Sequence, residues 1–377
     1  MEDTIFISIP SYRDPDCADT IKDAFSKAER PDFITVGVFV QDDVPFNYAG
    51  PCKERVLLLQ VGTEDAQGPC LARYVIETAI YLTQPTKQRF YLTIDAHTIF
   101  TRGWDTSLVR EWNKTNDSRA ILTTYPREYG VGRLWAPCQS SFLTASTWNV
   151  DGFPLYKLCP TLHLPARTRP MPSISWVAGL SFCLGTVISS VPYVHDVPYS
   201  FIGEETAMAI KYYTHGYNLY APSSDCNVLQ TTFRYGERPR FTTTIIGEKM
   251  RLKQASNLRL FTIICDGVEC GTERTVQDFY KYSGIDCIKK QFSKDATRGI
   301  TNIDTEEERI QKSPIDGGAI KRFIQRGKDD VFEKPDNKKI KEKEKEKERE
   351  RKNGRTKLKD IQKANPLLGP PAIKRRK

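Results

Sequence analysis

A carboxylate and an imidazole stand one residue apart where an apolar strand is expected to end. The stretch from Phe90 to Asp105 reads FYLTIDAHTIFTRGWD and places Asp95 and His97 directly after FYLTI. Side chains two residues apart on an extended chain point to the same side. A carboxylate oxygen and an imidazole nitrogen could therefore converge on one divalent cation, for which mixed ligation favours Mn²⁺, with Mg²⁺ as the alternative. The pattern is short and also occurs by chance.

The segments around this pair predict alternating strands and helices. Strands are expected in 4–9, 32–43, 55–62 and 89–97, and helices in 16–30 and 68–82. The runs TVGVFV and VLLLQV are typical of strands buried on both faces. This order favours an α/β fold with a parallel or mixed sheet and flanking helices. The ligand crevice of such a sheet lies beyond the carboxyl ends of its strands, where Asp95 and His97 are expected.

The remaining segments are less regular. Further strands are expected in 119–126, 138–145 and 175–189, and the Pro-rich stretch 155–172 is expected to be a long loop. A helix is predicted over 203–217, a strand–turn–strand over 218–231, and a last short helix over 275–286.

The positive net charge belongs to one end of the chain. Residues 337–377 hold 17 Lys and Arg against 6 Asp and Glu, whereas the other 336 residues hold 39 against 41. The run NKKIKEKEKEKERERK has no apolar stripe, so we expect a disordered basic tail. We expect a body over 1–292, a linker or peripheral segment over 293–336, and the tail over 337–377.

The start MEDTIFISIP predicts no secretory signal, and no apolar run reaches the roughly 18 residues that span a bilayer. The ten cysteines are scattered without a C-x-x-C pair. We therefore expect reduced thiols, no membrane contact and a cytoplasmic location, with the nucleus as a second destination that the basic tail allows.

Five segments in order resemble one family. These are IFISIPSYRDPDCADTIKDAFSKAERPDFITVGVFVQ, GPCLARYVIETAIYL, YLTIDAHTIFTRGWD, YSFIGEETAMAIKYYTHGYNLYAP and GTERTVQDFYKYSGID, which together span about residues 4–290. They resemble the cytoplasmic N-acetylglucosaminyltransferases that modify hydroxyproline on the adaptor subunit of SCF ubiquitin ligases. The resemblance implies a GT-A fold, with a Rossmann-like nucleotide-binding part over about 1–118 and an acceptor-binding part over about 119–292.

The resemblance also implies roles for particular residues. Asp95 and His97 would hold the metal beneath the diphosphate of UDP-GlcNAc. Nucleotide contacts would come from Asp95 and from four further residues: Ser11, Tyr12, Arg13 and Arg73. The sugar would be held by Gly179, Gly203 and Glu204, and Glu204 and Glu205 would join Asp95 and His97 as catalytic residues.

One position departs from the family pattern. Relatives carry a histidine, the expected third metal ligand, where NVLQ places Gln230 here. A glutamine oxygen binds Mn²⁺ more weakly than an imidazole does. Three explanations stay open: weak binding by Asp95, His97 and water, completion of the site by Asp225 or His215, or loss of turnover.

The implied function is retaining transfer of N-acetylglucosamine from UDP-GlcNAc to a hydroxyl of a protein, either hydroxyproline or Ser/Thr. The donor could also be a GalNAc or glucose nucleotide, and a homodimer is compatible with the sequence. The alternative is a catalytically weakened fold that acts as a binding module, whose basic tail contacts nucleic acid or acidic partners.

Overall fold

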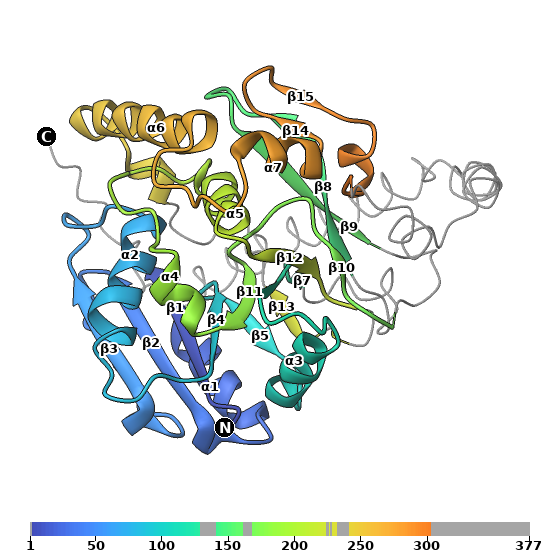
Figure 1. The fold of residues 1–377 in the computed structure, drawn as a ribbon. Coiled ribbons are helices and arrows are strands. Elements are labelled where there is room, and N and C mark those ends of the chain that lie inside the picture. Colours follow the sequence, from blue (N-terminus) through green and yellow to red (C-terminus); the bar gives the residue numbers. More distant parts are fainter. Residues whose placement is uncertain are drawn as a thin grey trace, which may run out of the picture. The chain divides into compact units, whose positions relative to one another are not determined.

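An eight-stranded mixed sheet runs through the structure (Figure 1). The computed structural model describes residues 2–128, 141–160, 168–223, 226, 228–231 and 241–302. The predicted tail 337–377 lies outside the described residues, as does 303–336 of the predicted linker. The domain boundaries expected from the sequence stay predictions.

The sheet joins a parallel half to a mixed half, in the order β10-β12-β6-β11-β4-β1-β2-β3. Its parallel strands are β1 (Ile5–Tyr12), β2 (Ile34–Gln41), β3 (Val56–Val61) and β4 (Phe90–Ile94). The mixed half contains β6 (Ala120–Thr123), β10 (Met171–Pro172), β11 (Leu180–Leu184) and β12 (Asn218–Ala221). Strand β11 runs antiparallel to both β4 and β6, so β6 runs in the same direction as β4. The expected α/β class with a mixed central sheet is confirmed.

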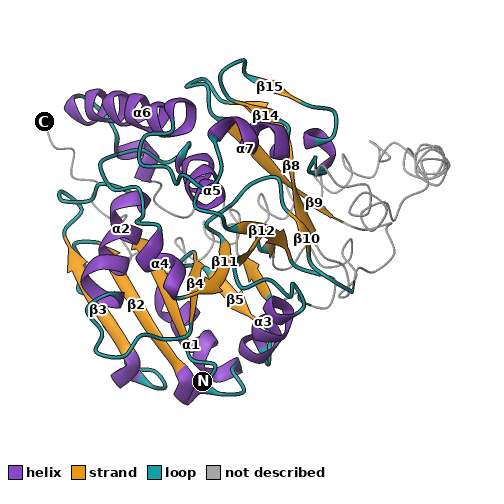
Figure 2. Ribbon diagram, in the orientation of Figure 1, coloured by secondary structure: helices purple, strands orange, loops and turns teal. Residues whose placement is uncertain are grey.

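Two apolar layers hold helices against the two faces of the sheet (Figure 2). One layer contains Ile5, Ile7 and Ile9 of β1 and packs against α1 (Cys17–Lys27) and α3 (Trp104–Asn113). The other face is covered by α2 (Pro69–Val75), α4 (Thr186–Ser190) and α5 (Glu204–Thr214). Helices α6 (Glu248–Asp266) and α7 (Val276–Ser283) pack against α5. The helix predicted over 68–82 continues beyond α2 as a π-helical segment, Ile76–Tyr81. The predicted β-α-β alternation thus produces a three-layer structure.

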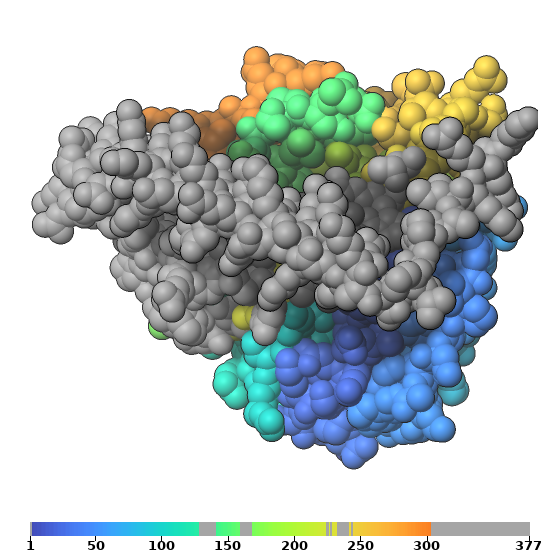
Figure 3. Space-filling view, turned by 180° about the vertical axis from the view of Figure 1, so that it is seen from behind, coloured from blue at the N-terminus to red at the C-terminus, as the bar shows by residue number. Residues whose placement is uncertain are grey.

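Smaller sheets complete the described part. One joins β5 (Thr98–Phe100), β13 (Leu229–Thr231) and β7 (Arg127–Glu128). A hairpin pairs β8 (Ser141–Trp148) with β9 (Pro154–Pro160), and β14 (Ile285–Asp286) pairs with β15 (Gln291–Phe292). Single 3₁₀ turns cover Pro31–Phe33, Lys53–Arg55, Phe241–Thr244 and Ala296–Arg298. Seen from behind, the N-terminal residues (blue) lie on one side and the β8–β9 region (green) and α6 (yellow) on the other (Figure 3).

Three expectations are corrected. The strand over 55–62 is not buried on both faces, because β3 ends the sheet and leaves Leu58 40% and Leu59 39% exposed. The stretch 155–172 is not all loop, since its first residues form β9 against β8. Helix α6 was not predicted: Leu260 and Ile263 are buried whereas Leu252 and Leu258 are exposed, so its apolar residues form no single stripe.

None of the helices in the described part of the chain is both long enough and apolar enough to cross a membrane.

Candidate active site

A cavity of about 710 Å³ opens at the carboxyl ends of β1 and β4. Its walls come from the end of β1, the loop after β4, the start of α2, the start of α5, the residues before β11, and β9. Parallel strands end at the same edge of a sheet, so segments distant in the sequence meet there.

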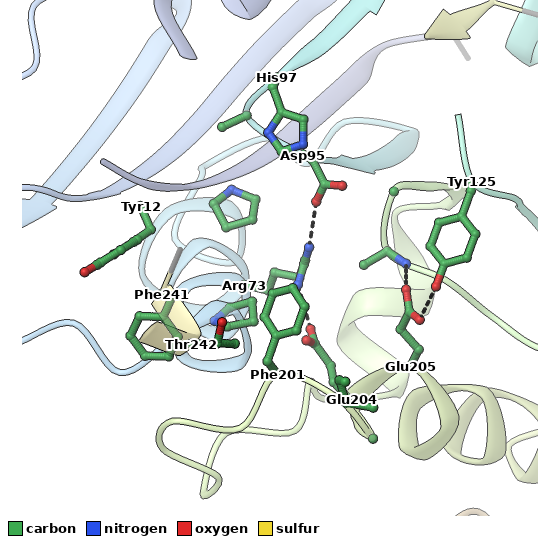
Figure 4. A pocket seen from close by; sticks show the side chains of 18 of the residues that line it. Tyr12, Arg73, Asp95, His97, Tyr125, Phe201, Glu204, Glu205, Phe241 and Thr242 are labelled. Atoms are coloured by element: carbon green, nitrogen blue, oxygen red, sulfur yellow. Dashed lines mark hydrogen bonds and ion pairs between the residues drawn. The ribbon is translucent and has the colours of Figure 1, made fainter. Parts of the chain in front are cut away.

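The guanidinium of Arg73 lies between two carboxylates (Figure 4). Its Nη1 is 2.7 Å from Glu204 Oε1 and its Nη2 is 3.2 Å from Asp95 Oδ1. The side chains of Arg73 and Glu204 are 6% and 3% exposed, whereas Asp95 is 40% exposed and faces the cavity. Burial lowers the pKa of Arg73, but the surrounding groups outweigh it together, and the net pKa is raised; Glu204 contributes most, followed by Tyr193, Asp95 and Cys70. Arg73 therefore stays a cation that ties the end of β4 to α2 and α5.

Glycines shape both helix starts at this site. Gly68 precedes α2 with φ +99°, and Gly203 precedes α5 with φ +104°, a region that residues with a Cβ rarely adopt. A Cβ on Gly203 would also lie 2.8 Å from the ring of Phe153. The same atom on Gly179 would lie 2.9 Å from Pro126 Cδ and 3.6 Å from Asp95 Oδ2. At Gly179 and Gly203 the backbone therefore lies closer to the neighbouring residues of the cavity wall than a residue with a side chain would allow.

The two glutamates that begin α5 have different partners. The hydroxyl of Tyr193 donates to Glu204 Oε1, the oxygen that also meets Arg73. Glu205 accepts hydrogen bonds from the Tyr125 hydroxyl at 2.5 Å and from the backbone N–H of Ala178 at 3.3 Å. Burial nevertheless raises the pKa of Glu205 to about 7. A carboxyl group that titrates near neutral pH in a cavity can hold or release a proton there.

His97 is oriented by an acid from another segment. Its Nδ1 lies 2.8 Å from Oδ2 of Asp14, in the loop after β1, and Asp14 is 8% exposed. A carboxylate on one ring nitrogen fixes the orientation of an imidazole and makes it a better metal ligand. Both His97 and Asp14 line the cavity.

The structure brings most of the predicted site residues together. Nine of them line the one cavity: Ser11, Tyr12, Arg73, Asp95, His97, Gly179, Gly203, Glu204 and Glu205. Arg13 is exposed and Gln230 is paired with Ile99 across β13 and β5, and neither lines the cavity. Of the alternatives for the third ligand, His215 is bound to the carbonyl of Lys211 at 2.7 Å, away from the cavity, and Asp225 lies outside the described residues.

The exposed carboxylate of Asp95 and the imidazole of His97 offer the oxygen and nitrogen donors that Mn²⁺ accepts. Within the described ranges, no three His, Cys, Asp or Glu side chains gather closely enough to hold a metal ion by themselves. The metal site stays a prediction, in which diphosphate oxygens or water would supply the remaining ligands.

Comparison with known families decides the class of this site. A family described as Glycosyltransferase (GlcNAc) matches residues 4–52 and 45–266. The chain belongs to this glycosyltransferase family. The family match covers the strand ends, Arg73 and the start of α5, which are the parts that build the cavity. No curated protein matches the chain.

Solved structures show more distant similarity. The crystal structure of GalNAc-T7 with UDP, GalNAc and Mn²⁺ is 12% identical with a TM-score of 0.49, covering 74% of this chain and 50% of that one. TarS 1–349 of S. aureus in complex with UDP-GlcNAc is 12% identical with a TM-score of 0.40, covering 70% and 71%. This chain thus spans half the length of the GalNAc-T7 chain.

Sequence reasoning missed several residues of the cavity, among them Asp14, Tyr125 and Phe241, and also the buried Tyr193. The rule that ligand sites lie beyond the carboxyl ends of the strands (the strand-end rule) could have found Tyr125. Strand β6 runs in the same direction as β4, and Tyr125 lies two residues beyond the end of β6. Asp14 stands next to the predicted Arg13 in the same loop. Nothing in the sequence around Tyr193 or Phe241 indicates a site.

We predict that Arg73→Met lowers the free energy of unfolding by about 3–5 kcal/mol, because it leaves the buried Glu204 without its cation. Urea unfolding measures this. Arg73→Met combined with Glu204→Gln is the matched variant, and it should lose clearly less stability than the single change. A double variant that loses the sum of the two single effects would contradict the pairing.

Glu205→Gln is predicted to stabilise the protein at pH 8 more than at pH 5. The folded-state pKa of about 7 lies above the ordinary 4.5, so Glu205 contributes stability below pH 4.5 that is lost as the pH rises to 7. The neutral amide escapes this loss, and its advantage should grow by about 2–3 kcal/mol between pH 5 and pH 8. Unfolding at both pH values tests this, with the exposed Glu54→Gln as the control. Equal pH dependence in both variants would count against the raised pKa.

Proposed function

We propose that this chain transfers N-acetylglucosamine from UDP-GlcNAc to a hydroxyl group of a protein, with retention of the anomeric configuration. The observation that carries the proposal is the buried Arg73, held between Asp95 and Glu204 in a cavity at the strand ends. Membership of a GlcNAc glycosyltransferase family supports the donor class.

In this proposal the donor lies across the strand ends. Ser11 and Tyr12, at the end of β1, would contact the uridine, and Arg73 and Asp95 would lie at the diphosphate. Arg73 with Asp95 and Glu204 carries a formal charge of −1, so a diphosphate beside Asp95 would meet net repulsion. Asp95 and His97 would hold a divalent cation, which would neutralise the charge of the departing UDP.

The sugar would face the start of α5. Glu204 and Glu205 offer carboxylate oxygens as acceptors for sugar hydroxyls, and Gly179 and Gly203 leave room for the ring. We propose front-face attack, in which the acceptor oxygen bonds to the anomeric carbon as the bond to the diphosphate breaks. The acceptor proton then passes to the leaving diphosphate, and the protein contributes position and charge stabilisation.

The resemblance to hydroxyproline-modifying enzymes supports a hydroxyproline or Ser/Thr acceptor and a cytoplasmic place of action. The alternative, a binding module whose basic tail contacts nucleic acid, predicts a different result. Nucleic-acid affinity that persists after deletion of 337–377 would favour that alternative.

Asp95→Ala is predicted to abolish UDP release from UDP-GlcNAc in the presence of Mn²⁺, because it removes the cavity's exposed carboxylate. Asp19→Ala, an exposed acid on α1, is the control and should keep wild-type turnover. Gln230→His should leave UDP release and its response to Mn²⁺ unchanged, because Gln230 does not line the cavity. UDP release by each of the three variants is measured with UDP-GlcNAc, UDP-GalNAc and UDP-glucose as donors. Full activity of Asp95→Ala would remove the proposed site.

A further inference from the structure

Strand β3 forms an edge of the central sheet without the usual protection. It ends the strand order, and no other strand of the described part of the chain pairs with its outer side (Figure 1). Proteins commonly guard such edges with charged residues, proline or a bulge. The sequence VLLLQV has neither a charge nor a proline, and its register with β2 is unbroken from Val56 to Val61.

The side chains of this edge are apolar and accessible. Leu58 and Leu59 are 40% and 39% exposed, although neighbouring residues of the parallel half are buried. Gln60 does not offer its amide to the edge, since its Nε2 donates to the carbonyls of Asp42 at 2.9 Å and Val44 at 2.8 Å. The edge therefore presents backbone donors and acceptors flanked by two leucines, which suits the addition of another strand.

The two ends of the strand carry opposite charges. Lys53, Glu54 and Arg55 precede β3 in one three-residue turn and carry a net charge of +1, whereas Glu64 and Asp65 follow the strand and carry −2. No ion pair joins any of these five side chains to another described residue of the chain. A strand with this pattern is complementary to a copy of itself in the antiparallel direction.

We propose that two copies of this chain associate through their β3 strands, which pair antiparallel across a two-fold axis and join the two central sheets. With the axis between Leu58 of one copy and Leu58 of the other, the Lys53 and Arg55 end of each strand lies alongside the Glu64 and Asp65 end of the other. The same patch is used by both copies, so the assembly closes at two. This inference does not depend on the proposed transferase activity.

The interface is small. Six residues per copy make the ladder. A ladder this short buries well below the roughly 800 Å² per partner of a standard interface, so we expect a dimer in the micromolar range rather than an obligate one. Opposite charges at both ends would select the antiparallel register and disfavour a parallel one, which would bring like charges together.

Sedimentation velocity of the full chain over a wide concentration range tests the dimer. Leu58→Lys should raise its dissociation constant about tenfold or more, since it places like charges against each other at the axis. Ile288→Lys, at a 59% exposed site between β14 and β15, should leave the dissociation constant unchanged. Far-UV circular dichroism and UDP release should match the wild type in both variants, because neither residue lines the cavity.

Charge reversal tests the register. Lys53→Glu and Glu64→Lys should each weaken the dimer, and their combination should restore it. A chain that is monomeric at every concentration would overturn the proposal, and so would a dimer that Leu58→Lys leaves intact. Failure of the combined reversal to restore the dimer would overturn the antiparallel pairing. Dimerisation that appears only after removal of residues 303–377 would show that the chain covers its own edge, and would contradict the proposal as well.

Discussion

A buried positive charge shared by two acids fixes the geometry of the site. Arg73 comes from α2, Asp95 from the loop after β4, and Glu204 from the first turn of α5. Removing a guanidinium from water is costly unless its partners are close and well aligned, so the three elements are held in one arrangement. The carboxylate that remains exposed, that of Asp95, faces the cavity as a result.

The rest of the fold serves this arrangement. Parallel strands β1 and β4 deliver the segments with Asp14 and Asp95 to the same edge, and His97 is held there by Asp14. Strand β11 runs antiparallel to β4, so the residues just before it, Ala178 and Gly179, lie at the same edge of the sheet and form another wall of the cavity. Glycines with positive φ begin both α2 and α5 and let their first turns approach the cavity. The geometry of the cavity therefore depends on backbone placement as much as on side chains.

The sequence was sufficient to predict strands with a repeating apolar pattern and site residues that lie next to strand ends. Alternation in β1 and the apolar run of β4 predicted the sheet, and the strand-end rule placed Asp95 and His97 correctly in the cavity. The rule does not reveal contacts between distant segments, so the pairing of Asp14 with His97 and of Tyr193 with Glu204 had no local signal. Burial of β3 was predicted wrongly, because composition does not show which strand lies at an edge.

If Asp95 and His97 hold a divalent cation as we propose, the acids around Arg73 make nucleotide binding depend on that cation. Calorimetric titration of UDP into the wild-type protein, with Mn²⁺ and with a chelator, tests it without requiring an acceptor. We predict that UDP binds at least about tenfold tighter with Mn²⁺, since the formal charge of −1 opposes the bare diphosphate. Equal affinity for UDP under both conditions would contradict it.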